Sequence, residues 1–79
     1  MIFVKLTGQF IALAPDGSEK GMFSAEFKVG VTLSALLKQL GVEAVGVKYM
    51  ALVNNSRKTG DYVLNDSDSI TVMPLLAGG

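Results

Sequence analysis

The part of this sequence best suited to chemistry is its end, where Gly78 and Gly79 follow each other. Two residues without a Cβ make the narrowest and most flexible peptide that a chain can form. Such a tail can enter a narrow channel of another protein and present its terminal carboxylate there. That carboxylate is ionised at neutral pH and is a poor electrophile. It needs activation, most simply as a mixed anhydride with a nucleotide, before a sulfur nucleophile can convert it to a thiocarboxylate.

The composition excludes most ways in which the chain could do this chemistry by itself. Its 79 residues include no cysteine and no histidine, which removes thiolate ligands, a cysteine nucleophile and the commonest general base. Seven basic residues balance seven acidic ones, so the positive field of a nucleic-acid-binding protein is missing. We therefore expect a carrier protein rather than an enzyme, with no bound metal or cofactor and no nucleic-acid partner.

The beginning of the chain predicts neither export nor membrane insertion. It has no basic segment before its first apolar residues, and Lys5 and Gln9 interrupt the apolar run, unlike a signal peptide. No stretch approaches the roughly 20 apolar residues of a membrane span. The expectation is a cytoplasmic protein without a membrane partner.

One helix and four to five strands are the elements expected to position the tail. The helix is predicted over 32–40, where four leucines form one apolar stripe, with Thr32 as N-cap and Gly41 as left-handed C-cap. Strands are predicted where apolar residues alternate or cluster, at 2–7, 22–29, 48–53, a short piece around 62–64, and 70–73. Residues 9–21 are compatible with a strand extension or a short helical turn.

The order of these elements predicts an α+β roll, in which the helix packs on one mixed sheet. The first and last strands are expected to be parallel neighbours, because the intervening helix supplies the crossover. The prediction is a single domain over 1–79, with a flexible C-terminal tail over 75–79.

A partner surface is predicted on the face of the sheet that the helix leaves open. Alternation places Phe3 on that face, with Met73 and Leu75 near it. An apolar cluster on an open sheet face commonly marks a protein interface, although single exposed apolar residues are equally normal. Together with Leu76 and Ala77 of the tail, these residues form the predicted partner-binding set.

Five stretches of the sequence carry a resemblance to a known family. They are Gly-Val-Thr-Leu at 30–33, Leu-Leu-Lys-Gln-Leu-Gly at 36–41, Leu-Val-Asn at 52–54, Leu-Asn-Asp-Ser-Asp at 64–68 and Met-Pro-Leu-Leu-Ala-Gly-Gly at 73–79. From Ile2 to Gly79 the chain resembles the ubiquitin-like sulfur carriers of the MoaD/ThiS family. These include the small subunit of molybdopterin synthase and the sulfur carrier of thiamine biosynthesis. The sequence departs from the family in two turns, where Asn55 and Ser67 stand in place of the usual glycine.

The resemblance implies a β-grasp fold, with a mixed sheet of four to five strands and one main helix. It also implies that an E1-like adenylating enzyme uses ATP to activate the carboxylate of Gly79, with Gly78 as the slender residue before it. A persulfide donor would then supply the sulfur of the thiocarboxylate, and a synthase large subunit is a further implied partner. The proline before the apolar-Ala-Gly-Gly end and the chain length favour molybdopterin over thiamine as the product.

Two other functions are compatible with the same residues. A protein modifier would use the diglycine to form an amide with a lysine of another protein. A β-grasp binding module with an accidental tail would work through Phe3 and Met73 and would not need Gly79. One fold hosts many functions, so these alternatives stay open at the level of sequence.

Overall fold

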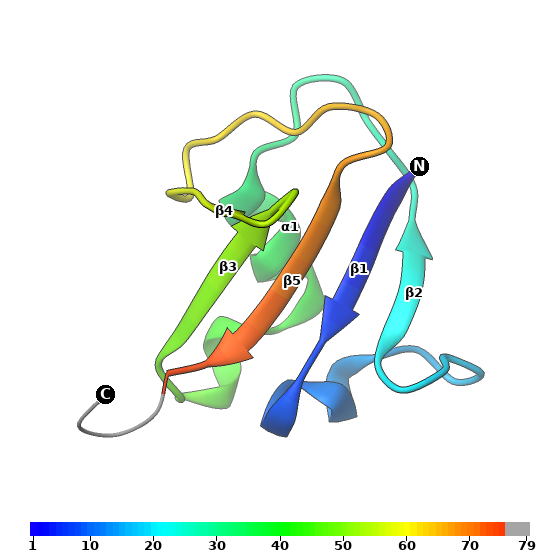
Figure 1. The fold of residues 1–79 in the computed structure, drawn as a ribbon, viewed down its shortest axis with the longest axis vertical. Coiled ribbons are helices and arrows are strands. Elements are labelled where there is room, and N and C mark those ends of the chain that lie inside the picture. The colour runs from blue at the N-terminus through cyan, green and yellow to red at the C-terminus, as the bar shows by residue number, and fades with distance from the viewer. Residues whose placement is uncertain (76–79) are drawn as a thin grey trace.

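The protein is built as one five-stranded mixed sheet with a helix on one of its faces (Figure 1). The computed structural model describes residues 1–75. The strands are β1 Ile2–Leu6, β2 Met22–Ala25, β3 Tyr49–Val53, β4 Ser56–Arg57 and β5 Ser69–Pro74. The helices are α1 Leu33–Leu40 and two short 3-10 helices, η1 Gly8–Leu13 and η2 Glu43–Val45. The predicted α+β architecture is confirmed.

The strands lie in the order β2-β1-β5-β3-β4. β1 and β5 run parallel, with Val4 opposite Ile70, and every other pair of neighbours is antiparallel. This confirms the predicted pairing of the first and last strands. Because they run in the same direction, β1 and β5 end at the same edge of the sheet, which is the edge from which the chain continues to its C-terminus (Figure 1).

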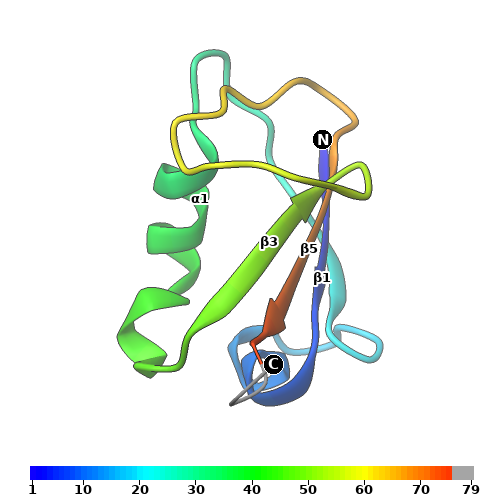
Figure 2. The ribbon, with the colours of Figure 1, turned by 60° about the vertical axis from the view of Figure 1, so that its left-hand side comes forward.

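The hydrophobic core lies between the sheet and α1, which covers one face only (Figure 2). In β1 the side chains of Ile2, Val4 and Leu6 are buried, whereas Phe3 between them is 47% exposed. This alternation follows from the period of two in a strand and confirms the predicted faces. The helix contributes Leu33, Leu36 and Leu37 as the buried members of its apolar stripe.

Both predicted caps of α1 are present. The Oγ1 atom of Thr32 accepts a hydrogen bond from the backbone N–H of Ala35 at 3.1 Å, which satisfies one of the free donors of the first turn. Gly41 adopts a left-handed φ of 86°, and its N–H donates to the last carbonyls of the helix. Within residues 1–75, no helix is both long and apolar enough to cross a bilayer.

The second strand is shorter than its alternating pattern predicts. It ends at Ala25 rather than at Val29, and the Val29 side chain is 93% exposed. The chain has to leave the edge of the sheet here to reach the start of α1. It does so through a turn in which Val31 N–H donates to the carbonyl of Lys28, with Gly30 at a φ of 88°.

Two features near β3 also differ from the predicted strands. Residues around 62–64 do not join the sheet; Val63 instead forms an isolated bridge with Thr32, next to the start of α1. Conversely, the short strand β4 pairs with β3 through a turn whose two asparagines, Asn54 and Asn55, both have positive φ. Asparagine tolerates this conformation, so the turn itself was predictable but the strand after it was not.

The two departures from the family pattern lie at left-handed positions. Asn55 has a φ of 69° and Ser67 a φ of 73°. Glycine adopts such a conformation at no steric cost, and other residues do so rarely. The backbone geometry expected of a glycine is therefore kept at both turns by a residue with a side chain.

Candidate functional site

The chain leaves the sheet at the end of β5. Of the predicted site residues, the structure describes three that were predicted to bind a partner: Phe3, Met73 and Leu75. The other predicted residues, Leu76, Ala77, Gly78 and Gly79, lie outside the described residues. Their roles stay predictions. What the structure defines is the base of the tail and the surface beside it.

The end of β5 is held on both sides by hydrogen bonds to or from its backbone. On the β1 side, the N–H and the Oγ1 hydroxyl of Thr7 both donate to the carbonyl of Val72, at 3.0 and 2.9 Å. On the β3 side, the N–H of Leu75 donates to the carbonyl of Lys48 at 3.0 Å. Hydrogen bonds on both flanks restrict the backbone up to residue 75, so the tail starts from a defined place and direction.

Pro74 ends β5 in an unusual setting, because β5 lies between two other strands and proline cannot donate to a ladder. After the bond from Thr7 to Val72, the next bond of a parallel ladder would run from the residue at 74 to the carbonyl of Thr7. That carbonyl accepts the N–H of Phe10 instead, at 3.1 Å, and η1 begins there. Pro74 therefore leaves no acceptor unpaired at the end of β1, because the turn after β1 already supplies a donor to the Thr7 carbonyl.

Phe10 supports this edge from inside the core. Its side chain is fully buried and meets the ring of Tyr49 edge to face, with centroids 5.9 Å apart; Tyr49 is the register partner of Pro74. Burial, and then the charge of Glu43, raise the pKa of the Tyr49 phenol. The apolar run at 10–13 was the available signal for η1, but it did not reveal which of its residues is enclosed.

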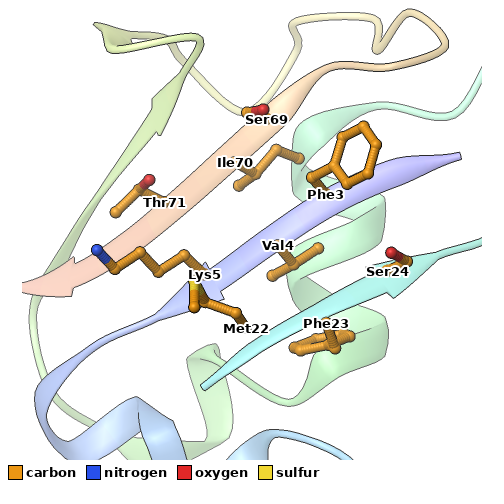
Figure 3. A pocket seen from close by; sticks show the side chains of 9 residues that line it. All are labelled: Phe3, Val4, Lys5, Met22, Phe23, Ser24, Ser69, Ile70 and Thr71. Carbon is orange, nitrogen blue, oxygen red and sulfur yellow. The ribbon is translucent and has the colours of Figure 1, made fainter. Parts of the chain in front are cut away.

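The open face of the sheet carries an apolar depression of about 440 Å³ between β2, β1 and β5 (Figure 3). Phe3 and Met22 rise from it, each 47% exposed, and Lys5 lies between Met22 and Thr71 on neighbouring strands. Met22 was not among the predicted partner-binding residues, although its alternation with Phe23 placed it on this face. The prediction that Phe3 faces away from the helix is confirmed.

Phe3 and Met73 share the open face but are not in contact. Phe3 lies opposite Ser69, and Met73 is four residues further along β5, which corresponds to about 13 Å along a strand. Near the tail, Met73 is instead paired with Met50 of β3, and both are partly buried. The predicted partner surface is thus two apolar groups on one face rather than a single cluster.

The charge of this face is uniform. Residues directly opposite each other in a sheet share a face, so Arg57 lies on the same side as Leu52, and Lys5 lies on the same side as Phe3. None of the outward-facing residues of the described strands is acidic; they are Phe3, Lys5, Met22, Ser24, Met50, Leu52, Arg57, Ser69, Thr71 and Met73. An apolar partner with carboxylates at its rim would be complementary to this surface.

The main polar network lies at the other end of the sheet and serves the turns. The buried carboxylate of Asp68 accepts hydrogen bonds from Asn54 Nδ2 at 2.9 Å, from the N–H of Asn65 at 2.8 Å and from the Tyr62 hydroxyl at 3.3 Å. These three hydrogen bonds tie the carboxylate to the turns around it. Among the residues described, no three acidic side chains gather where they could hold a metal ion.

The family model that matches this chain is that of the ThiS family, and it matches residues 4–79. The chain belongs to the ThiS family. This confirms the resemblance to the ubiquitin-like sulfur carriers, which generally work with E1-like activating enzymes. A comparison with curated protein sequences finds no match.

Two solved structures resemble this ThiS-family chain over almost their whole lengths. SAMP1 from Haloferax volcanii superposes with a TM-score of 0.73 at 18% identity, covering 99% of this chain and 98% of the other. Urm1 from Trypanosoma brucei superposes with a TM-score of 0.71 at 21% identity, covering 99% and 94%. At these identities the likeness concerns the fold, and it confirms the predicted β-grasp architecture.

Proposed function

We propose that this ThiS-family chain is a sulfur carrier whose working group is the carboxylate of Gly79. The observation that supports the proposal most directly is that hydrogen bonds fix the end of β5. The chain continues from this point into a tail that ends in Gly78-Gly79. The sulfur is donated in cofactor biosynthesis, with molybdopterin favoured over thiamine by the proline and the apolar residues before the diglycine. The chain acts as a carrier and leaves catalysis to its partners.

The chemistry proceeds in three balanced steps. In an E1-like enzyme, a carboxylate oxygen of Gly79 attacks the α-phosphorus of ATP, pyrophosphate leaves, and an acyl adenylate forms. The terminal sulfur of a persulfide on a donor protein then attacks the acyl carbon, AMP leaves, and an acyl disulfide results. A thiol of the donor cleaves that sulfur–sulfur bond, which leaves a thiocarboxylate on Gly79 and a disulfide on the donor.

The open face is the proposed docking surface for the activating enzyme. It offers Phe3 at one end, Met50 and Met73 near the tail, and Met22 beside the positive charge of Lys5 between them. Apolar surface supplies affinity on burial, and a charge of one sign selects and orients a partner of the other sign. We therefore expect carboxylates beside the apolar contact surface of the partner.

The experiment that tests the carrier function is a measurement of intact mass. The purified chain, with Gly79 verified as its last residue, is incubated with an E1-like enzyme, ATP and a persulfide donor. We expect a mass gain equal to the replacement of one oxygen by one sulfur, confined to the C-terminal fragment. An unchanged mass with several such enzymes, while the same enzymes load their own carriers, would contradict the proposal.

Replacing Phe3 by glutamate is expected to weaken binding to the activating enzyme by about tenfold or more, as for a central contact residue of an interface. The change puts a charge on the open face without touching the core, because the side chain points away from α1. Val29→Glu is the matched control, since Val29 is 93% exposed and lies outside the sheet. Titration calorimetry on both variants checks this, and equal affinities would show that the enzyme docks elsewhere.

Covalent attachment to other proteins is the second candidate function, because the same terminal diglycine would serve it. It uses the same activated Gly79, but the acceptor is a lysine amine instead of a persulfide. Recovery of this chain in amide linkage to larger proteins from cell extract, without any thiocarboxylate form, would favour the modifier.

A further inference from the structure

Gly8 is packed against the ring of Pro74 at the edge of the sheet where the tail begins. A Cβ added to Gly8 would lie 2.8 Å from Pro74 Cγ and 3.0 Å from Cδ, closer than two carbon atoms normally approach. Gly8 also has a φ of 57°, in the left-handed region that favours glycine. Both the contact and the backbone therefore require a residue without a side chain at this position.

Neither partner of this contact can move aside easily. The ring of Pro74 is rigid, and its backbone is held between the hydrogen bonds at Val72 and Leu75. Gly8 is held by its neighbour Thr7, which donates twice to Val72. A side chain at position 8 would consequently push on Pro74 and, through it, on the residue that follows.

Pro74 and Leu75 together form what we call the tail exit. On one side it meets Gly8, and on the other side Leu75 donates to the carbonyl of Lys48. Opposed contacts of this kind set the direction in which the chain leaves the sheet, as well as the place. For a terminal group that must reach a reaction centre in another protein, direction is part of the catalytic geometry, and a displacement of about 1 Å can cost about a hundredfold in rate.

We infer that Gly8 is a positioning residue, whose close contact with Pro74 aims the tail exit at the centre of the activating enzyme. The inference rests on the proposed carrier function. Gly8 lies 71 positions before Gly79 in the sequence. Its effect on the reaction of Gly79 passes through its contact with Pro74.

The test compares Gly8→Ala with Gly30→Ala. Both place a Cβ at a positive φ, but nothing lies within 4 Å of the added atom at Gly30, and Gly30 follows β2, at the end of the sheet opposite the tail exit. Gly30→Ala thus has the strain of a side chain at positive φ but lacks a close contact of the added Cβ. We expect Gly8→Ala to lower kcat/KM for adenylation by about tenfold to a hundredfold and Gly30→Ala to leave it close to that of the unmodified chain.

A double-mutant cycle separates the contact from a general loss of structure. Pro74→Ala removes the ring atoms that the new Cβ would meet, so the effect of Gly8→Ala should largely disappear in the Pro74→Ala background. A loss of rate that persists in that background, or that equals the loss in Gly30→Ala, would overturn the positioning role.

Amide hydrogen exchange of Leu75 gives a readout that needs no enzyme. Its N–H donates to Lys48, so a displaced tail exit should speed its exchange in Gly8→Ala but not in Gly30→Ala or in the double variant. If the unmodified chain gains no sulfur, the proposed function fails and this exchange pattern alone decides on the contact. If the chain gains sulfur while neither exchange nor rate responds to Gly8, the positioning role is wrong and the carrier function stands.

Discussion

Deletion of Gly79 is expected to abolish the gain of sulfur, with a loss in the rate of adenylation of at least about a hundredfold. The deletion leaves a carboxylate on Gly78, but moves it back by one residue, or about 3.5 Å. Attack on a nucleotide phosphorus needs the oxygen near van der Waals contact, so a group that falls short by this distance does not react. Adenylation measured by ATP–pyrophosphate exchange, together with the intact mass, checks the prediction.

Gly79→Ala is the matched variant for this experiment, because it keeps the carboxylate in place and adds only one methyl group. We expect it to be impaired less than the deletion, by an amount that reports how narrow the channel of the enzyme is. The fold should be unaffected in both variants, since every core residue of the described structure precedes residue 75. Full activity after the deletion would remove the tail from the mechanism and favour a binding module that acts through its open face.

Phe10→Ala is expected to lower the free energy of unfolding by about 3–5 kcal/mol. The side chain is fully buried and its ring packs against Tyr49, so truncation leaves a cavity where the core meets the edge that carries the tail. Domains are stable by only about 5–15 kcal/mol, and a small one lies at the lower end. The variant should therefore be close to unfolding at 37 °C, which urea denaturation followed by circular dichroism measures.

Ile11→Ala is the control for Phe10, because it is the next residue of η1 and is 46% exposed. We expect a cost of less than about 1 kcal/mol, as for a partly exposed side chain. Equal costs for the two variants would contradict the anchoring of η1 by Phe10.

Local patterns predicted the elements whose stability depends on nearby residues. The alternation of Ile2, Val4 and Leu6 identified β1 and its buried face, and the leucine stripe with Thr32 and Gly41 identified α1 and both its ends. These predictions succeeded because strand period, helix period and caps are properties of a few consecutive residues.

Sequence patterns failed to predict strands correctly where the pairing of a backbone depends on a segment that is distant in sequence. The alternation continues to Val29, but β2 stops at Ala25 because the chain must turn towards α1. Val63 pairs with Thr32 instead of joining the sheet, and β4 forms only because the Asn54-Asn55 turn brings it back along β3. Each outcome depends on which other segment lies beside the residues in question, and the whole fold decides that.

The sequence by itself determined what chemistry the chain can offer: a thin tail ending in Gly78-Gly79, and no cysteine or histidine with which to act on it. Only the tertiary structure decided how the base of that tail, up to Leu75, is held. It brought Gly8 against Pro74, set Phe10 beneath Tyr49, and placed Phe3 and Met73 far apart on one face. The physical reason is that the two contacts join residues 66 and 39 positions apart, whose adjacency follows from the strand order and register of the sheet rather than from any local period.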